Sequence, residues 1–326
     1  MEQREIARLG RSVSVVGLGT WQLGADWGEV DDERARAVLE TAVSHGITFF
    51  DTADVYGDGR SERFCGELHR RHPDVFIATK MGRRAEQSLE SYASRNNLWS
   101  WNARSTENLG LVPLDLVQLH CPPDPVYASE LVFELLDELV ESERIRAYGV
   151  SVETCEQALQ AIARPHVATV QIILNCFRLK PLEQVLPAAQ AAGVGIIARV
   201  PLASGMLSGR FDESTTFAAN DHRNFNRRGE AFDVGETFSG VPYETGLAAV
   251  RELRELLDDG MSLAQFALRW VIDQPGVSTV IPGASSVEQV AQNASVAELA
   301  PLREDQLAGA RDVYDRLIRE YVDARW

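Results

Sequence analysis

The sequence predicts an α/β fold, and more specifically one (β/α)8 barrel of the TIM type over residues 1–326. Two observations predict it. Eight short apolar segments, each typical of a buried strand, alternate along the chain with segments of helical periodicity. No composition change typical of a linker divides them, so a single domain is expected. An open doubly wound sheet is the alternative, and it would require a glycine-rich first turn.

The elements follow in order from the N-terminus. Residues 5–8 and Val13–Val16, with Gly10 between them, predict a β-hairpin that closes the bottom of the barrel. The first helix begins at Asp31–Asp32, carries apolar residues at helical spacing and ends at Gly46. The predicted barrel strands are Val15–Leu18, Ile47–Phe50, Val75–Thr79, Asp115–Leu119, Ile145–Val150, Val167–Ile173, Gly195–Arg199 and Val277–Ile281. The later predicted helices are Ser61–Arg70, Asn97–Leu109, Tyr127–Glu141, Thr154–Ala163, Leu182–Ala192, Tyr243–Leu257, Ser262–Asp273, Val287–Ala297 and Glu304–Tyr321.

Two segments depart from this alternation. Gly17 and Gly19 look like the start of a dinucleotide-binding G-x-G-x-x-G motif, but Gln22 stands where the third glycine belongs, so the motif fails. Trp21 and Trp27 are instead expected to line a cleft. The second segment, Phe211–Val241, shows no clean periodicity and is longer than ordinary loops. Because it follows the seventh strand, we expect it to form a lid at the catalytic end of the barrel.

Composition excludes several function classes. The formal net charge is -16, and no basic stripe is present, so nucleic acid is an unexpected partner. No apolar run is long enough to span a membrane and the N-terminus has no apolar signal region, so a cytoplasmic location is expected. The four cysteines, Cys65, Cys121, Cys155 and Cys176, are scattered without metal-ligand spacing, so neither disulfides nor a bound metal is expected.

Four polar residues lie at or just beyond the ends of neighbouring predicted strands: Asp51, Tyr56, Lys80 and His120. The C-terminal ends of strands in a parallel barrel meet on one face, so these side chains should share a small volume. Of the 32 basic residues only two are lysine, Lys80 and Lys180, and lysine, unlike arginine, has a pKa that responds readily to burial.

This set of residues suits proton transfer to a carbonyl oxygen. An ammonium at Lys80 would lower the pKa of Tyr56, and Asp51 would keep Lys80 charged. Tyr56 could then donate a proton to an oxygen that gains negative charge, and His120 could donate a hydrogen bond to the same oxygen. No side chain donates hydride, so a nicotinamide cofactor must supply it.

The motifs FDTADVYG, ATK and LQLH, in this order on a predicted barrel, resemble the aldo-keto reductase superfamily. The resemblance extends from GLGTW to IPGASSVEQVAQN, and its closest pattern is that of bacterial members similar to potassium-channel β subunits. It implies a catalytic tetrad of Asp51, Tyr56, Lys80 and His120. It also implies NAD(P)H-dependent reduction of a small aldehyde or ketone to an alcohol.

The resemblance further implies a cofactor that lies extended across the barrel mouth. Ser151 and Gln171 would hold the nicotinamide amide, although Val152 replaces a usual asparagine. Arg199 stands where an aromatic residue often stacks on the nicotinamide, and it could either stack or form a structural ion pair. The full implied set is Thr20, Trp21, Asp51, Ser151, Gln171, Arg199, Pro201, Leu202, Ser204, Gly205, Arg210, Gly283, Ser285, Gln289, Gln292 and Asn293.

Residues 281–293 bear on the choice between the two nicotinamide cofactors. This segment opens a predicted helix, whose N-terminus favours a phosphate, but it contains no lysine or arginine. Ser285, Gln289, Gln292 and Asn293 resemble the uncharged set with which the β-subunit branch binds NADP. We therefore expect NADPH, with NADH less favoured.

Two other functions are weighed against reduction. A regulatory, β-subunit-like binding protein is the first alternative, but that branch has asparagine where this chain has His120. A Schiff-base aldolase is the second, but it needs a neutral lysine and Asp51 would keep Lys80 charged. An apolar wall of Trp21, Trp27 and Tyr56, with Trp99, Trp101 and Phe225 considered nearby, suits an apolar or aromatic carbonyl compound. The sequence is also compatible with a homo-oligomer.

Overall fold

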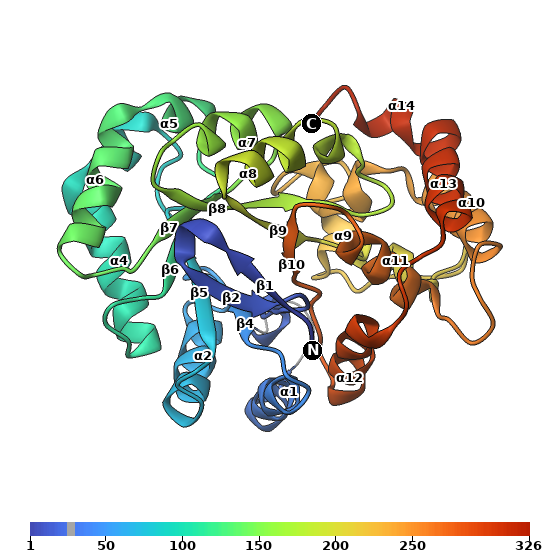
Figure 1. Ribbon diagram of the computed structural model, residues 1–326, viewed down its shortest axis with the longest axis horizontal. Helices are drawn as coiled ribbons and strands as arrows, with labels where there is room; N and C mark the ends of the chain where they lie inside the picture. The colour runs from blue at the N-terminus through green and yellow to red at the C-terminus, as the bar shows by residue number, and fades with distance from the viewer. Residues whose placement is uncertain (25–29) are drawn as a thin grey trace.

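The computed structural model describes residues 1–24 and 30–326, and within them eight parallel strands form a closed barrel (Figure 1). The strands are neighbours in chain order: β3 (Leu18–Gly19), β4 (Phe49–Asp51), β5 (Phe76–Met81), β6 (Leu116–His120), β7 (Tyr148–Ser151), β8 (Val167–Ile173), β9 (Gly195–Arg199) and β10 (Val277–Val280). Parallel bridges from Val16 to Val280 and from Gly19 to Gly283 join the first strand to the last. These bridges exclude an open sheet.

Helices surround the barrel on the outside (Figure 1). They are α1 (Asp32–Ser44), α2 (Arg60–Arg71), α3 (Leu89–Tyr92), α4 (Arg95–Leu109), α5 (Asp124–Ala128), α6 (Glu130–Glu141), α7 (Cys155–Ile162), α8 (Val185–Ala192), α9 (His222–Phe225), α10 (Tyr243–Arg254), α11 (Leu263–Ile272), α12 (Val287–Ser295), α13 (Glu304–Val313) and α14 (Arg319–Val322). Side-chain caps begin several of them: Asp31 accepts a hydrogen bond from the backbone of Arg34, and Thr154 forms a capping box with Gln157. No helix in these two ranges is both long and apolar enough to cross a membrane.

The predicted hairpin is present and lies across one end of the barrel (Figure 1). Its strands are β1 (Gln3–Ile6) and β2 (Arg11–Ser14). Ile6 and Val13 join a separate buried cluster with Phe49 and with other residues from the barrel interior. That cluster fills the N-terminal end of the barrel with apolar side chains, so the polar chemistry is confined to the opposite end.

Several predicted boundaries need correction. The structure confirms β8 and β9 as predicted, whereas β4 to β7 begin and end later and β3 is only Leu18–Gly19. The strands extend to the polar residues themselves because Asp51 pairs with Ala78 and His120 pairs with Ser151 in the ladders. The predicted helix over 127–141 is broken at Ser129, whose extended backbone places its hydroxyl as the N-cap of α6. The predicted helix over 304–321 is interrupted by a π-helical turn at Tyr314–Ile318.

The segment Phe211–Val241, called the lid segment below, contains only short elements. These are α9 and two 3₁₀ turns, η5 (Val234–Glu236) and η6 (Phe238–Gly240). This explains why the sequence shows no periodicity there. Asn226 holds part of the segment together, because its side-chain oxygen accepts hydrogen bonds from the backbone of Ala231 at 2.8 Å and of Phe232 at 3.0 Å.

Candidate active site

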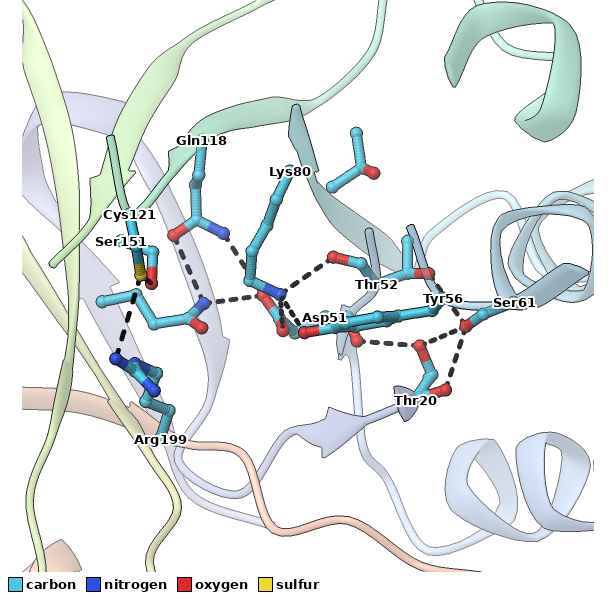
Figure 2. Close-up of polar contacts among 12 residues, drawn as sticks. Thr20, Asp51, Thr52, Tyr56, Ser61, Lys80, Gln118, Cys121, Ser151 and Arg199 are labelled. Atoms are coloured by element: carbon cyan, nitrogen blue, oxygen red, sulfur yellow. Dashed lines mark hydrogen bonds and ion pairs between the residues drawn. The ribbon is translucent and has the colours of Figure 1, made fainter. Parts of the chain in front are cut away.

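A buried lysine lies at the centre of the site (Figure 2). The Nζ atom of Lys80 donates to Oδ1 of Asp51 at 2.5 Å, to the backbone oxygen of Thr52 at 3.0 Å and to the hydroxyl of Tyr56 at 3.1 Å. All three ammonium hydrogens therefore have an acceptor. Lys80 is 1% exposed and Asp51 is 2% exposed, so the ion pair is shielded from water. The structure brings together the lysine, aspartate and tyrosine that the sequence singles out.

The second oxygen of Asp51 is held by two glutamines. Oδ2 accepts hydrogen bonds from Gln118 at 3.2 Å and from Gln171 at 2.7 Å. Gln118 was not among the predicted site residues. Gln118 lies two positions before His120 on β6. Residues two apart on a strand face the same side of the sheet, so the alternation of side chains along β6 is the sequence signal that could have identified Gln118.

A chain of hydroxyl groups positions the start of the loop that carries Tyr56. Ser61 accepts from Thr52 at 2.9 Å and donates to the hydroxyl of Thr20 at 2.7 Å, and Thr20 in turn donates to the backbone oxygen of Asp51 at 2.8 Å (Figure 2). The hydroxyl of Thr20 is thus occupied by protein groups. This chain of hydrogen bonds fixes the backbone around Asp51, the last residue of β4.

Rings from two other parts of the chain contact the ring of Tyr56. The ring of Trp21 stacks on Tyr56 with centroids 5.9 Å apart, and the ring of His120 meets Tyr56 edge-on at 6.0 Å. The predicted apolar wall of Trp21 and Tyr56 is present, while Trp27 lies outside the described residues. Phe225 contacts the ring of Phe232, which in turn contacts Trp21.

The protonation states follow from burial and neighbouring charge. Burial alone would lower the pKa of Lys80, but Asp51 and Tyr56 raise it above the ordinary lysine value, so the amine is charged. Burial, followed by the charges of Arg83, Lys80 and Arg199, lowers the pKa of His120 well below its ordinary value, so the imidazole is neutral.

From the sequence we expect Lys80 to lower the pKa of Tyr56. For the protein alone, this expectation is wrong. Burial raises the pKa of Tyr56 above the ordinary phenol value, and the opposing effect of Lys80 does not outweigh it. The phenol is therefore protonated, which is the form that a proton donor needs. The lysine reduces the free-energy cost of the phenolate without making it the resting state.

Arg199 forms an ion pair. Its guanidinium contacts the carboxylate of Glu236 and donates to the backbone oxygen of Val152 at 3.0 Å, and both members of the pair are nearly buried. The sequence leaves open whether Arg199 stacks on a nicotinamide or forms a structural ion pair, and the structure shows the ion pair. Ser204 also reaches the lid segment, because its hydroxyl donates to the backbone oxygen of Glu236 at 2.6 Å.

The lid segment lies against the tetrad. The rings of His222 and Phe232 contact Trp21 at centroid distances of 5.5 Å and 6.2 Å, and Trp21 stacks on Tyr56. Together with the bonds to Glu236, these contacts hold the lid segment against the barrel mouth.

The remaining predicted cofactor residues lie on two segments. Residues 200–209 turn repeatedly through left-handed backbone, with positive φ at Val200, Ala203, Ser204, Gly205 and Gly209. Pro201 and Leu202 belong to the same loop, and Arg210, which follows it, is exposed. Such a loop can direct backbone N–H groups towards an anion.

The other segment precedes and opens α12. Gln289 accepts from the backbone N–H of Ser285 at 2.8 Å, and Asn293 donates to the backbone oxygen of Gly283 at 3.5 Å. Gln292 is exposed beside them. The buried polar atoms without a partner among the described residues include Nδ1 of His120 and Nε of Arg199 at the barrel mouth. A loop suited to phosphate, a helix N-terminus and unsatisfied groups at the barrel mouth fit a nicotinamide dinucleotide.

The model of the Aldo/keto reductase family matches residues 15–315. The chain belongs to the aldo/keto reductase family. Its relatives include the aldo-keto reductase YhdN of Bacillus subtilis, 32% identical over 89% of this chain and 87% of the relative. A probable voltage-gated potassium channel subunit beta of Arabidopsis thaliana is 26% identical over 93% of each chain.

Solved structures agree with this assignment. The glycerol dehydrogenase AKR11B4 from Gluconobacter oxydans superposes with a TM-score of 0.80 at 28% identity, covering 99% of this chain and 98% of that one. An aldo/keto reductase from Klebsiella pneumoniae, crystallised in complex with NADP and acetate, gives a TM-score of 0.68 at 25% identity over 94% and 93% of the two chains. The barrel fold, the resemblance to this superfamily and its β-subunit members, and the prediction of an oxidoreductase are confirmed. The family uses NAD(P)H.

One further acidic residue lies beside the tetrad and was not predicted from the sequence. Asp54 is 1% exposed, and its Oδ1 atom has no hydrogen-bond partner among the described residues. It lines a cavity of about 500 Å³ together with Arg84, Trp101 and Arg104. Both arginines pair with Asp58, at 2.6 Å and 2.5 Å. Burial, followed by repulsion from a neighbouring carboxylate, raises the pKa of Asp54 to about 7.

Asp54 should make stability depend on pH. The pKa of its carboxyl is about 7 in the folded protein and near 3.8 when unfolded, so its stabilising contribution is complete below pH 4 and is lost as the pH rises through 7. Asp54→Asn removes this loss. Between pH 4 and pH 8 its free energy of unfolding should rise relative to wild type by on the order of 2–4 kcal/mol, measured by urea denaturation. A difference between the two proteins that stays constant with pH would show that Asp54 titrates normally.

Proposed function

We propose that this protein is an NADPH-dependent carbonyl reductase that converts an aldehyde or ketone to an alcohol. The supporting observation is the buried ammonium of Lys80, which bonds Asp51 and the hydroxyl of Tyr56 at the same time. Membership of a family of oxidoreductases supports the same reaction class.

Each tetrad residue has a role that follows from its contacts. Tyr56 donates its phenolic proton to the carbonyl oxygen, and Lys80 stabilises the phenolate that remains. Asp51 keeps Lys80 charged and directs it, while its own orientation is fixed by Gln118 and Gln171. Neutral His120 can donate a ring N–H to the same oxygen without competing for the proton. Bound NADPH supplies the hydride for the carbonyl carbon.

The cofactor would lie across the barrel mouth. The amide nitrogen of Gln171 is used by Asp51 and Gln118, so its carbonyl oxygen is the atom available to a nicotinamide amide, with Ser151 on the other side. Arg210 and the preceding loop would hold the pyrophosphate, and Ser285 and the residues of α12 would hold the adenosine end. Arg199 and Ser204 both contact Glu236, so the lid segment lies beside the proposed cofactor site.

The alternatives are less well supported. A Schiff-base aldolase needs a neutral lysine, and the raised pKa of Lys80 keeps it charged. A β-subunit-like binding role with little turnover is suggested by one relative's name, but the chain keeps His120 beside a complete Asp–Tyr–Lys arrangement. The single domain, the cytoplasmic location and a homo-oligomer stay predictions.

Removing the phenol of Tyr56 should separate catalysis from binding. Tyr56→Phe should lower kcat for carbonyl reduction by about 10²- to 10⁴-fold because the proton donor is lost. NADPH binding, measured by fluorescence titration, should stay near the wild-type value. Tyr321→Phe, on α14, is the matched control and should keep full activity. Near wild-type turnover in Tyr56→Phe would refute the assignment of the proton donor.

Cofactor preference forms a second test. We expect kcat/KM to be at least about tenfold higher with NADPH than with NADH, since uncharged groups at α12 can bond the extra phosphate. Arg210→Met should raise KM for NADPH by about tenfold, because a charge-assisted bond to phosphate is lost. Arg311→Met, an exposed position on α13, should not change it. A tenfold preference for NADH would contradict the proposal.

A further inference from the structure

The turn that follows β5 holds Arg83 on a rigid backbone. The backbone N–H of Ala85 donates to the oxygen of Gly82 at 3.1 Å. The side-chain amide of Gln87 donates to the same oxygen at 3.0 Å and to that of Ala85 at 2.9 Å, and Tyr92 donates to Gln87 at 3.2 Å. A Cβ on Gly82, which has φ +99°, would lie 2.7 Å from the Tyr92 ring. The backbone around Arg83 is therefore fixed before any ligand arrives.

Strand register places this turn beside the candidate active site. Met81, the last residue of β5, pairs with Leu119 on β6, so the turn follows at the level of His120 and Cys121. The charge of Arg83 acts on groups at this same level. After burial, the charge of Arg83 is the largest cause of the lowered pKa of His120, and it also helps to lower the pKa of Glu236.

Arg83 has no charged partner in the described part of the chain. It is partly buried, yet no carboxylate among residues 1–24 and 30–326 forms an ion pair with it, and its guanidinium donates no hydrogen bond there. The other arginine at the barrel mouth, Arg199, forms an ion pair with Glu236 and donates a hydrogen bond to the backbone oxygen of Val152. The guanidinium of Arg83 is always charged and carries several N–H donors, so it can bond an anion that enters the barrel mouth.

We propose that Arg83 binds a carboxylate on the substrate, so that this reductase acts on carbonyl compounds that also carry a carboxylate group. The planar guanidinium can bond both oxygens of a carboxylate. A doubly charged phosphate fits less well, because Glu153 and Glu236 lie near the same charge. This inference rests on the proposed function, and it refines the expectation of an apolar or aromatic substrate by adding an anionic end.

The reaction balances with the carboxylate as a spectator. The aldehyde carbon accepts a hydride, which carries two electrons from NADPH, and the aldehyde oxygen accepts the proton of Tyr56. The products are a primary alcohol and NADP⁺, and Tyr56 regains a proton from solvent. The carboxylate stays bound to Arg83 throughout and orients the carbonyl group towards Tyr56 and His120.

A matched pair of aldehydes tests this specificity. 4-Carboxybenzaldehyde and its methyl ester share the ring and the aldehyde and differ in charge. With wild-type protein and NADPH, kcat/KM should be about 10- to 100-fold higher for the acid, mainly through KM, because a charge-assisted bond is made before the reaction. Arg83→Met should lower the acid-to-ester ratio by at least about tenfold, and Arg83→Lys should restore part of it.

Arg84→Met is the control, since Arg84 lies in the same turn but is exposed and pairs with Asp58. It should keep the wild-type ratio. Equal use of acid and ester by the wild-type protein, or an equal loss for both in Arg83→Met, would overturn the role of Arg83 while leaving the reductase function intact. Reduction of neither aldehyde would count against the proposed function itself, and the inference would fall with it.

Discussion

The structure depends on one constraint: a lysine ammonium is buried in the barrel and must be fully bonded. An unpaired buried charge would cost several kcal/mol. Lys80 avoids this cost only because β4 and β5 are in register, which places Asp51 and the backbone of Thr52 around its Nζ atom. Tyr56 provides the third acceptor. The hydrogen bonds that satisfy the buried charge of Lys80 are therefore the same bonds that build the catalytic arrangement.

The two ends of the barrel are closed in different ways, and this difference fixes where chemistry can occur. At one end, Ile6 and Val13 of the hairpin complete an apolar cluster. At the other, the lid segment is attached through ring contacts with Trp21 and through polar contacts that include the Arg199–Glu236 ion pair. The polar contacts of the lid segment can be exchanged for those of a ligand. Burial at this end of the barrel raises the pKa of Tyr56 and lowers that of His120.

The sequence predicts those features that depend on short-range pattern. Strand and helix alternation predicts the barrel, and the positions of Asp51, Lys80 and His120 at strand ends predict that they meet. Features that depend on packing between distant segments could not be predicted in this way. The partner of Arg199 is one, because Glu236 lies in a segment without periodicity. The direction of the Tyr56 pKa shift is another, since it depends on how deeply the folded chain buries the ring.

The central claim is that Asp51 and Lys80 act as one unit on Tyr56, and a double-mutant cycle tests it most directly. Single-turnover rates of aldehyde reduction would be measured for Asp51→Asn, Lys80→Met and the double variant. If the two residues act through the same bond, the double variant should be no slower than the slower single variant. If the two losses multiply, the residues act independently and the claim is contradicted.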